Sequence, residues 1–223
     1  MILSQNIYFV IKNIKVSIED FNEIKKYLSD EELLKLNSYY FYEDQLRFGL
    51  GRYILRTNLS KYLDCSPSDI EIEYNYYGKP FITQAANIYF NISHSMDFVI
   101  VVFYEYPIGV DIEYNIKFID DLINEIFFSS SEINYLNSLS SETKKQEFFK
   151  IWTYKESYIK AIGKGMSENP SSIDIMSTRD NILNYKEDTY KILTITDIHP
   201  SYSCALCYRA QNINDLPKIL QVK

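Results

Sequence analysis

Hydrophobic and polar positions alternate along several stretches of the chain with the period of two that is typical of strands. The run at residues 98–104 is uninterrupted and apolar, about the length of one buried strand and far too short to cross a bilayer. After residue 171 the chain is expected to be mostly strand. The strands predicted in this way span residues 7–16, 70–74, 88–93, 98–104, 108–113, 191–196 and 202–209.

Helix signals stand between these strands. Ser29 is followed three residues later by Glu32, which is the spacing of a capping box at the start of a helix. Gly163 and Gly165 supply the residue that helix C-termini favour. This mixture predicts an α/β (α+β) fold. The other predicted helices span residues 43–63, 118–127, 130–138 and 142–162, and a turn is predicted at residues 77–80.

A weak internal repeat divides the chain into halves. Residues 28–39 match residues 128–139 at five positions with an offset of 100, and residues 52–56 lie over residues 156–160 with an offset of 104. We therefore expect two pseudo-symmetric α/β halves, with a ligand site in the cleft between them. The halves are predicted to span residues 1–105 and 106–223.

Charge and hydropathy exclude several classes of protein. The 223 residues carry 23 Lys and Arg against 30 Asp and Glu, a formal net charge of −7, whereas proteins that bind a phosphate backbone normally carry the opposite sign. No nucleic-acid partner is therefore expected. The N-terminus lacks the pattern of a secretory signal and no membrane association is predicted, so the expected compartment is the cytoplasm.

One cysteine pair invites a metal or redox interpretation. Cys204 and Cys207 have the C-x-x-C spacing, but they lie in a strand-like run, where side chains three apart point to opposite faces. No second cysteine pair is present to complete a zinc site. We expect both to be core residues of a strand.

Two carboxylates mark one predicted strand. Asp111 and Glu113 are two residues apart and therefore project from the same face. A hard cation would relieve their mutual repulsion, and Mg²⁺ is usually held by one or two carboxylates together with water and phosphate oxygens. A solvent-facing strand with alternating charges is the other interpretation of this spacing.

An acid and a base share a helix face further along. Glu156 and Lys160 are one turn apart, and Trp152 precedes Glu156 by another turn. An exposed ion pair worth about 0.3–0.5 kcal/mol would explain this spacing. The alternative is a partly buried face that holds a metal ion and a phosphate beside the aromatic ring.

The remaining candidates are phosphate-binding groups. Ser93 and His94 end an apolar strand and offer hydroxyl, backbone N–H and imidazole donors. A serine–histidine nucleophile pair is the rival interpretation, but adjacent residues rarely reach the required geometry. The basic side chains that suit a phosphate, or else form an ordinary solvated surface, are Lys35, Arg47, Arg52, Arg56 and Lys79.

Three motifs in this order resemble a known family. They are Phe90-Asn-Ile-Ser-His-Ser95, Gly109-Val-Asp-Ile-Glu113 and Trp152-Thr-Tyr-Lys-Glu-Ser-Tyr-Ile-Lys-Ala-Ile-Gly-Lys-Gly165. Each is weak alone, but the ordered set resembles a 4′-phosphopantetheinyl transferase of the larger, surfactin-synthetase-activating (Sfp-like) type. The resemblance includes Tyr77-Gly-Lys-Pro80 and Glu43-Asp-Gln-Leu-Arg47 and covers roughly residues 30–165.

The resemblance implies a fold, a reaction and a set of site residues. The family has two similar α/β halves with coenzyme A between them. Its members transfer the phosphopantetheine arm of coenzyme A to a serine of an apo acyl or peptidyl carrier protein, release 3′,5′-ADP and depend on Mg²⁺. Matching positions assign the metal to Asp111, Glu113 and Glu156, catalysis to Glu156 and Lys160, and coenzyme A binding to Lys35, Arg47, Lys79, Pro80, Ser93, His94 and Lys160.

Within the coenzyme A set the resemblance gives each group a part of the molecule. Lys160 matches the lysine on the pyrophosphate, and Ser93 and His94 match phosphate contacts. The pair at Lys35 and Arg47 matches contacts to the 3′-phosphate, and Lys79 and Pro80 match the adenine-side loop. Glu32 stands where some relatives place a second lysine, a departure that bears on the strength of 3′-phosphate binding.

Two rival functions remain beside the one that the resemblance implies, and the resemblance also implies a carrier protein as partner. One rival is a degenerate relative that binds coenzyme A or a carrier without catalysis, but retention of all three carboxylates and Lys160 argues against it. The other is a different Mg²⁺-dependent phosphotransferase, for which the sequence has no Walker loop or kinase-type glycine-rich signature. Because carriers are commonly acidic and this chain is at −7, we expect an apolar patch around residues 116–128 to dock the carrier. Duplicated halves would complete the site within one chain, so a monomer is expected.

Overall fold

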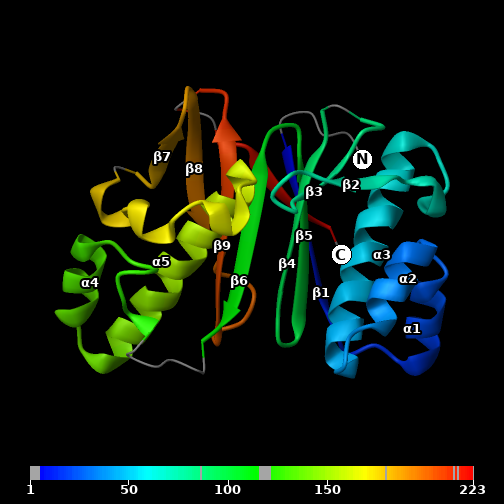
Figure 1. The fold of residues 1–223 in the computed structure, drawn as a ribbon, viewed down its shortest axis with the longest axis horizontal. Coiled ribbons are helices and arrows are strands. Elements are labelled where there is room, and N and C mark those ends of the chain that lie inside the picture. Colours follow the sequence, from blue (N-terminus) through cyan, green and yellow to red (C-terminus); the bar gives the residue numbers. More distant parts are fainter. Residues whose placement is uncertain are drawn as a thin grey trace. The chain divides into compact units, whose positions relative to one another are not determined.

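Figure 1 shows the fold in a computed structural model that describes residues 6–85, 87–115, 122–178, 180–212, 214 and 216–222. The chain divides into two compact units, and the main boundary falls between Glu105 and Tyr106. Two segments cross this boundary: residues 74–79 belong to the second unit, and residues 217–223 belong to the first. No helix within the described ranges is long and apolar enough to cross a membrane.

The first unit contains a four-stranded sheet in the order β10–β1–β5–β4. Strand β1 is antiparallel to β5, which is antiparallel to β4, whereas β1 and β10 run parallel. The centre of β5, from Val99 to Phe103, is completely buried, which explains its unbroken apolar run. The strands span Asn6–Asn13 (β1), Tyr89–Ser95 (β4), Phe98–Tyr104 (β5) and Lys218–Val222 (β10).

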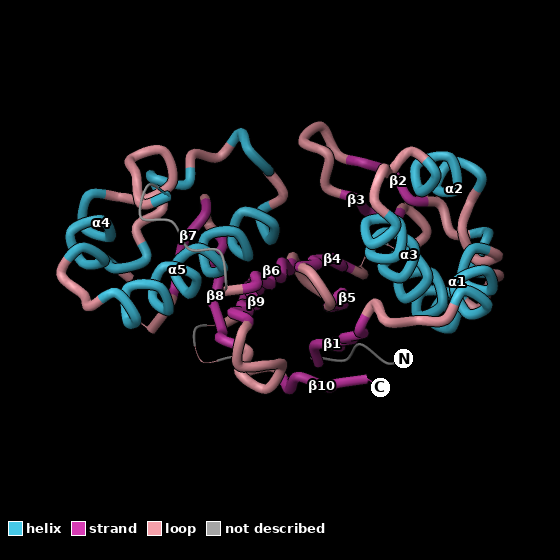
Figure 2. Tube along the Cα trace, turned by 90° about the horizontal axis from the view of Figure 1, so that it is seen from below, coloured by secondary structure: helices cyan, strands magenta, loops and turns pink. Residues whose placement is uncertain are grey.

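Helices cover one face of this sheet, as Figure 2 shows. Their apolar sides pack with the sheet into one core, in which Phe21, Leu36 and Leu55 are almost fully buried. The helices are α1 (Ile18–Lys25), α2 (Asp30–Asn37) and α3 (Tyr42–Leu63), and α3 is followed by a 3-10 turn at Pro67–Asp69 and by the short strands β2 (Ile72–Tyr74) and β3 (Pro80–Ile82).

The second unit is built on an antiparallel sheet in the order β6–β9–β8–β7. Strand β9 lies between β6 and β8, and it carries Cys204 and Cys207 as free, buried thiols. Their interpretation as core residues of a strand is confirmed. The strands span Ile108–Tyr114 (β6), Ile182–Tyr185 (β7), Asp188–Thr194 (β8) and Tyr202–Ala210 (β9).

Helix α5 (Ser141–Ile162) lies across one face of this second sheet (Figure 2) and buries residues such as Phe148 and Tyr158 against it. It ends at Gly163, which takes the left-handed φ of 74° that glycine adopts without strain. The shorter α4 (Ser130–Asn137) precedes it. Three 3-10 turns follow α5, at Gly165–Ser167, Pro170–Ser172 and Ile175–Ser177.

Each unit contains the same pair of helices. An eight-residue helix with a complete capping box, at Ser29 and Glu32 or at Ser129 and Glu132, precedes a helix of 22 residues. The short helices are related by the predicted offset of 100. The long helices are related by 99, so the offset of 104 predicted for this region is wrong. The second alignment failed because similar helical sequences match in more than one register.

The predicted strands and helices are present with shifted ends, apart from one helix. Residues 125–127 form a turn, and residues 123 and 124 are not helical, rather than continuing the helix predicted at 118–127, whose first four residues lie outside the described residues. The cause is local, because the side chain of Asn124 accepts a hydrogen bond from the backbone of Ile126 and favours a turn. The hydrophobic pattern did not predict helix α1 or strands β3, β7 and β10, which are short or lie at sheet edges.

Candidate active site

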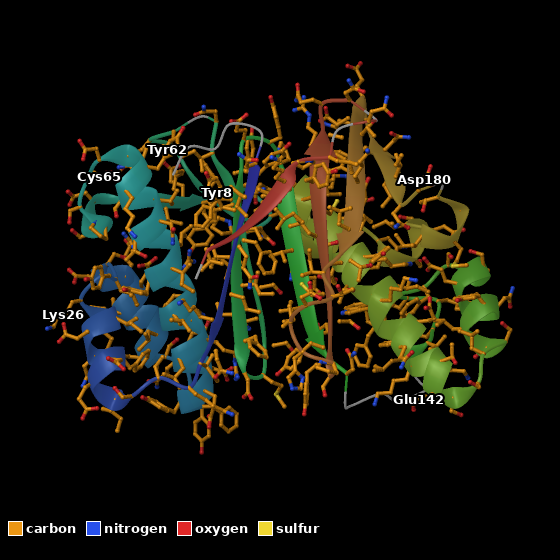
Figure 3. All side chains as sticks on the ribbon, turned by 180° about the vertical axis from the view of Figure 1, so that it is seen from behind. Tyr8, Lys26, Tyr62, Cys65, Glu142 and Asp180 are labelled. Carbon is orange, nitrogen blue, oxygen red and sulfur yellow. The ribbon has the colours of Figure 1, made fainter. Side chains whose placement is uncertain are left out.

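Glu156 and Lys160, the predicted catalytic residues, lie in the last two turns of α5. The helix begins near Glu142, labelled in Figure 3, and is capped at Gly163, so Glu156 and Lys160 lie towards its C-terminal end. Both side chains are partly buried, whereas the adjacent Lys155 is completely buried. The helix therefore presents Glu156 and Lys160 on a different side from Lys155.

Strand β6 brings the two predicted metal ligands to this helix. Gly109, Asp111 and Glu113 are every second residue of β6 and therefore lie on the same face of the strand, the face that meets α5. A Cβ atom at Gly109 would lie 2.1 Å from the carbonyl oxygen of Ser157, so only glycine lets the helix pack this closely on the strand. As a result, Oδ1 of Asp111 reaches Nζ of Lys160 at 2.5 Å.

Lys160 is surrounded by negative charge. Its partner Asp111 is only 3% exposed, while the Lys160 side chain keeps 28% of its surface in contact with solvent. Burial alone would lower the pKa of Lys160, but the charges of Asp111, Glu156 and Glu113 outweigh it and raise the pKa. The ammonium therefore stays protonated at neutral pH and can neutralise an anion.

Glu156 is a carboxylate of increased basicity. Burial is the main cause of its raised pKa, Asp111 adds to the increase, and Lys160 opposes it. A raised pKa makes a carboxylate a better proton acceptor than an ordinary glutamate. The end of α5 thus combines a carboxylate suited to accept a proton with a cation suited to bind a phosphate.

The carboxylates have the chemistry of an open magnesium site. Asp111, Glu113 and Glu156 offer hard oxygen donors around one cationic centre, where the Lys160 ammonium lies. Among the described residues no group of three or more His, Cys, Asp or Glu is arranged to hold a metal ion by itself. Mg²⁺ usually takes only one or two carboxylates and completes its shell with water and substrate phosphate oxygens, so this donor set fits it.

In the first unit a guanidinium meets the end of a predicted phosphate-binding strand. Arg47 on α3 donates from Nη1 to the carbonyl oxygen of Met96 at 2.8 Å, and it also pairs with Asp44 at 2.6 Å. Met96 lies in the turn directly after β4, which carries Ser93 and His94. Ser93 is buried and His94 is exposed. The structure therefore brings Arg47 to the turn that follows Ser93 and His94.

Two other predicted coenzyme contacts lie elsewhere in the first unit. Lys35 is in the last turn of α2, with Nζ 5.3 Å from the centre of the Tyr39 ring. Pro80 begins β3. No hydrogen bond or ion pair joins either residue to Arg47 in the part of the chain that the structure describes.

Lys79 belongs to the second unit, whereas the next residue, Pro80, belongs to the first. Its ammonium donates to the carbonyl oxygens of Ile108 and Ala161, each at 3.1 Å. Burial lowers the pKa of Lys79 to about 8. The predicted contact between Lys79 and coenzyme A stays a prediction.

The sequence predicted the capping box of Glu32 but not the buried ion pairs of its carboxylate. This buried carboxylate accepts hydrogen bonds from the backbone of Ser29 and from Nε of Arg56 at 2.7 Å, and it lies 3.4 Å from Nε of Arg52. Arg52 and Arg56 are buried as well, so they are core cations rather than a solvated surface. The repeated capping box was the signal that could have revealed this role.

Comparison with known proteins agrees with the motifs. The family model described as the 4′-phosphopantetheinyl transferase superfamily matches residues 107–207, and the model for the N-terminal part of 4′-phosphopantetheinyl transferases matches residues 14–105. The 4′-phosphopantetheinyl transferase gsp of Aneurinibacillus migulanus is 34% identical over 198 residues, which is 88% of this chain and 82% of that protein. The chain belongs to the 4′-phosphopantetheinyl transferase family.

Two further members of the 4′-phosphopantetheinyl transferase family support the Sfp-like type. Sfp of Bacillus subtilis (strain 168) is 32% identical over 204 residues, 90% of this chain and 91% of that protein. HetI of Nostoc sp. is 38% identical over 147 residues, 63% of this chain and 62% of that protein. This 4′-phosphopantetheinyl transferase family member is therefore an enzyme that transfers a group.

Proposed function

We propose that this enzyme transfers the 4′-phosphopantetheine arm of coenzyme A to a serine of an apo acyl or peptidyl carrier protein and releases 3′,5′-ADP. The observation that carries the proposal is the position of the Lys160 ammonium among the carboxylates of Asp111, Glu113 and Glu156. The reaction requires a hydroxyl to lose its proton and a diphosphate to leave with added charge. The cluster holds a group for each task.

Glu156 is the proposed general base. Its carboxylate would remove the serine proton, either directly or through an intervening water, and in the metal-free protein burial raises its pKa. Since Glu156 lies one turn before Lys160 on the same helix, the proton acceptor and the phosphate-binding cation are held at a fixed separation.

Lys160 is the proposed cation on the pyrophosphate. It stabilises the charge that develops on the departing 3′,5′-ADP, because its ammonium is already oriented by Asp111 and needs no reorganisation. A bound Mg²⁺ would take one or two ligands from the carboxylates of Asp111, Glu113 and Glu156, with water and substrate oxygens completing its shell. It would neutralise the pyrophosphate and make the phosphorus more electrophilic.

The first unit supplies the proposed contacts to the 3′-phosphate and the adenine side of coenzyme A. Arg47, His94 and Lys35 offer cationic or neutral donors to the phosphate, and Ser93 offers a hydroxyl. Besides its hydrogen bond to Met96, Arg47 pairs with the carboxylate of Asp44, which neutralises part of its charge. Pro80 is assigned to the adenine side.

Transfer is expected to require a divalent metal. Exhaustive chelation should abolish it, because the clustered carboxylates would repel the pyrophosphate without a cation of higher charge than Lys160 alone. Readdition of Mg²⁺ should restore the rate, and the melting temperature of the chelated enzyme serves as a control for folding. Undiminished transfer after chelation would contradict this part of the proposal.

Dephospho-coenzyme A is expected to be a poorer donor than coenzyme A, since it lacks the group that Arg47, His94 and Lys35 are proposed to bind. Arg47→Ala should raise the KM for coenzyme A about tenfold or more, the size of a lost charged hydrogen bond. The same variant should leave the KM for dephospho-coenzyme A almost unchanged. An equal rise for both donors at matched salt would show that Arg47 acts only by holding the β4–β5 turn through Met96.

Mass spectrometry of carrier proteins incubated with coenzyme A and enzyme tests the function directly. A panel of apo carriers from fatty-acid, polyketide and nonribosomal-peptide systems should show at least one that gains the phosphopantetheine mass on its serine. Of the patch predicted to dock the carrier, residues 116–121 lie outside the described residues. Ile126 is 68% exposed, whereas Phe128 is buried in the core, so Ile126 is a candidate contact and Phe128 is not.

A further inference from the structure

The turn at residues 74–79 is fastened to the end of α5 by its two polar residues. The amide of Asn75 donates to the carbonyl oxygen of Gly163 at 2.8 Å, and its Oδ1 accepts from the backbone of Tyr77 and Lys79. The aliphatic chain of Lys79 runs along Gly163, where a Cβ atom would lie 3.0 Å from Cδ of the lysine. The turn therefore presents the Lys79 ammonium to the interior of the second unit.

The Lys79 ammonium links the two elements that form the charge cluster. It donates to the carbonyl oxygen of Ile108, at the start of β6, and to that of Ala161, in the last turn of α5. Ile108 lies three residues before Asp111, and Ala161 directly follows Lys160. One cation thus bridges the strand and the helix immediately beside their Asp111–Lys160 ion pair.

The surroundings of Lys79 suit a structural cation. Carbonyl groups at a helix C-terminus carry partial negative charge and are natural acceptors for a lysine. Within the described residues no carboxylate pairs with this ammonium, and the nearby thiol of Cys207 is neutral because burial holds its pKa well above the ordinary value. Burial without a charged partner lowers the pKa of Lys79 to about 8.

We propose that Lys79 is a positioning residue of the transfer reaction, whose ammonium ties β6 to the end of α5 and so fixes Lys160 against Asp111. The proposal rests on the function proposed above. It leaves the backbone and aliphatic chain of Lys79 for the adenine-side contact, since both hydrogen bonds of the ammonium point to the protein interior.

Three variants of the same turn test this role. Lys79→Met keeps the length of the chain but removes the ammonium, and Lys79→Arg restores a cation that can donate to both carbonyls. Tyr76→Ala is the matched control, because Tyr76 lies in the same turn and is 95% exposed. The readouts are hydrogen exchange at the backbone amides of residues 161–163, and kcat and KM for coenzyme A at saturating carrier.

Lys79→Met should speed hydrogen exchange in the last turn of α5 and lower kcat about tenfold to a hundredfold, with the KM for coenzyme A almost unchanged. Lys79→Arg should recover a large part of both losses, and Tyr76→Ala should resemble the wild type. If Lys79→Met does not fold, Asn75→Ala removes the neighbouring bond to Gly163 and carries the same expectations.

Two results would overturn the proposal. A raised KM for coenzyme A with unchanged kcat and unchanged exchange would assign the ammonium to the coenzyme. A lower melting temperature with wild-type kcat in the folded range would leave Lys79 with a role in stability alone. If the wild type transferred nothing to any carrier, the proposed function would fail, yet the exchange measurement would still show whether Lys79 ties β6 to α5.

Discussion

The Glu156→Gln variant is expected to transfer phosphopantetheine at least about two orders of magnitude more slowly than the wild type, with an unaltered fold. Glutamine is nearly isosteric, but it accepts no proton from the carrier serine and brings no negative charge to a metal ion. If Glu156 formed only an exposed ion pair with Lys160, the change would cost at most about 0.5 kcal/mol of stability and leave transfer intact. Single-turnover rates and thermal unfolding, measured on one preparation, separate these outcomes.

A control on the same helix makes the comparison sharper. Glu147 pairs with the half-exposed Lys150 at 3.4 Å, so Glu147→Gln should change neither the rate nor the melting temperature appreciably. Lys160→Ala should also slow transfer, because the departing diphosphate loses a donor. A stable Glu156→Gln variant with near-wild-type turnover would reject the assignment of Glu156 as base and metal ligand.

The elements that position this site could be predicted because each is encoded over a short stretch of sequence. The alternation of Asp111 and Glu113 on a strand and the spacing of Glu156 and Lys160 on a helix depend only on the periods of β and α structure. The end of α5 was marked by Gly163, and its left-handed φ of 74° is the conformation for which glycine is selected.

Contacts between distant segments could not be predicted in the same way. Lys79 and Ala161 are 82 residues apart, and nothing in either segment announces that a backbone carbonyl will receive the ammonium. Gly109 was noted only as part of a motif, whereas in the structure its missing Cβ is what lets α5 approach β6. Both features depend on how the helix docks on the sheet, which a single sequence does not encode locally.

Glu32 shows a different limit, that of interpretation by family resemblance. In the comparison with the family, Glu32 was noted only as the residue that stands where some relatives have a phosphate-binding lysine. Compared with its own repeat, it is the equivalent of Glu132, and both acids combine a capping box with a buried cation, Arg56 in one unit and Lys155 in the other. Glu32 is thus accounted for by its ion pair in the core of the first unit, and its placement says nothing about the strength of 3′-phosphate binding.

Breaking the buried ion pair between Glu132 and Lys155 is expected to destabilise the fold by about 3–5 kcal/mol. Neither side chain is exposed at all, and Glu132 also accepts hydrogen bonds from the backbone of Ser129 and Ile175 at 2.9 and 2.8 Å. Glu132→Gln keeps the shape but removes the charge and places an amide donor against either the Lys155 ammonium or the backbone N–H of Ile175. Urea unfolding measures the loss, and Glu147→Gln should remain within about 0.5 kcal/mol of the wild type.

The double variant Glu132→Gln/Lys155→Met separates the pair from its surroundings. Its cost should be clearly smaller than the sum of the two single variants, since no uncompensated charge is left in the core. Lys155 also donates to the carbonyl oxygens of Phe127 and Pro170 at 3.0 and 2.9 Å, and its loss leaves these acceptors buried. Additive costs would contradict the ion-pair interpretation.

Because Lys155 faces the core and not the side of α5 that carries Glu156, transfer per folded molecule should fall far less in Lys155→Met than in Glu156→Gln, although the two residues are adjacent.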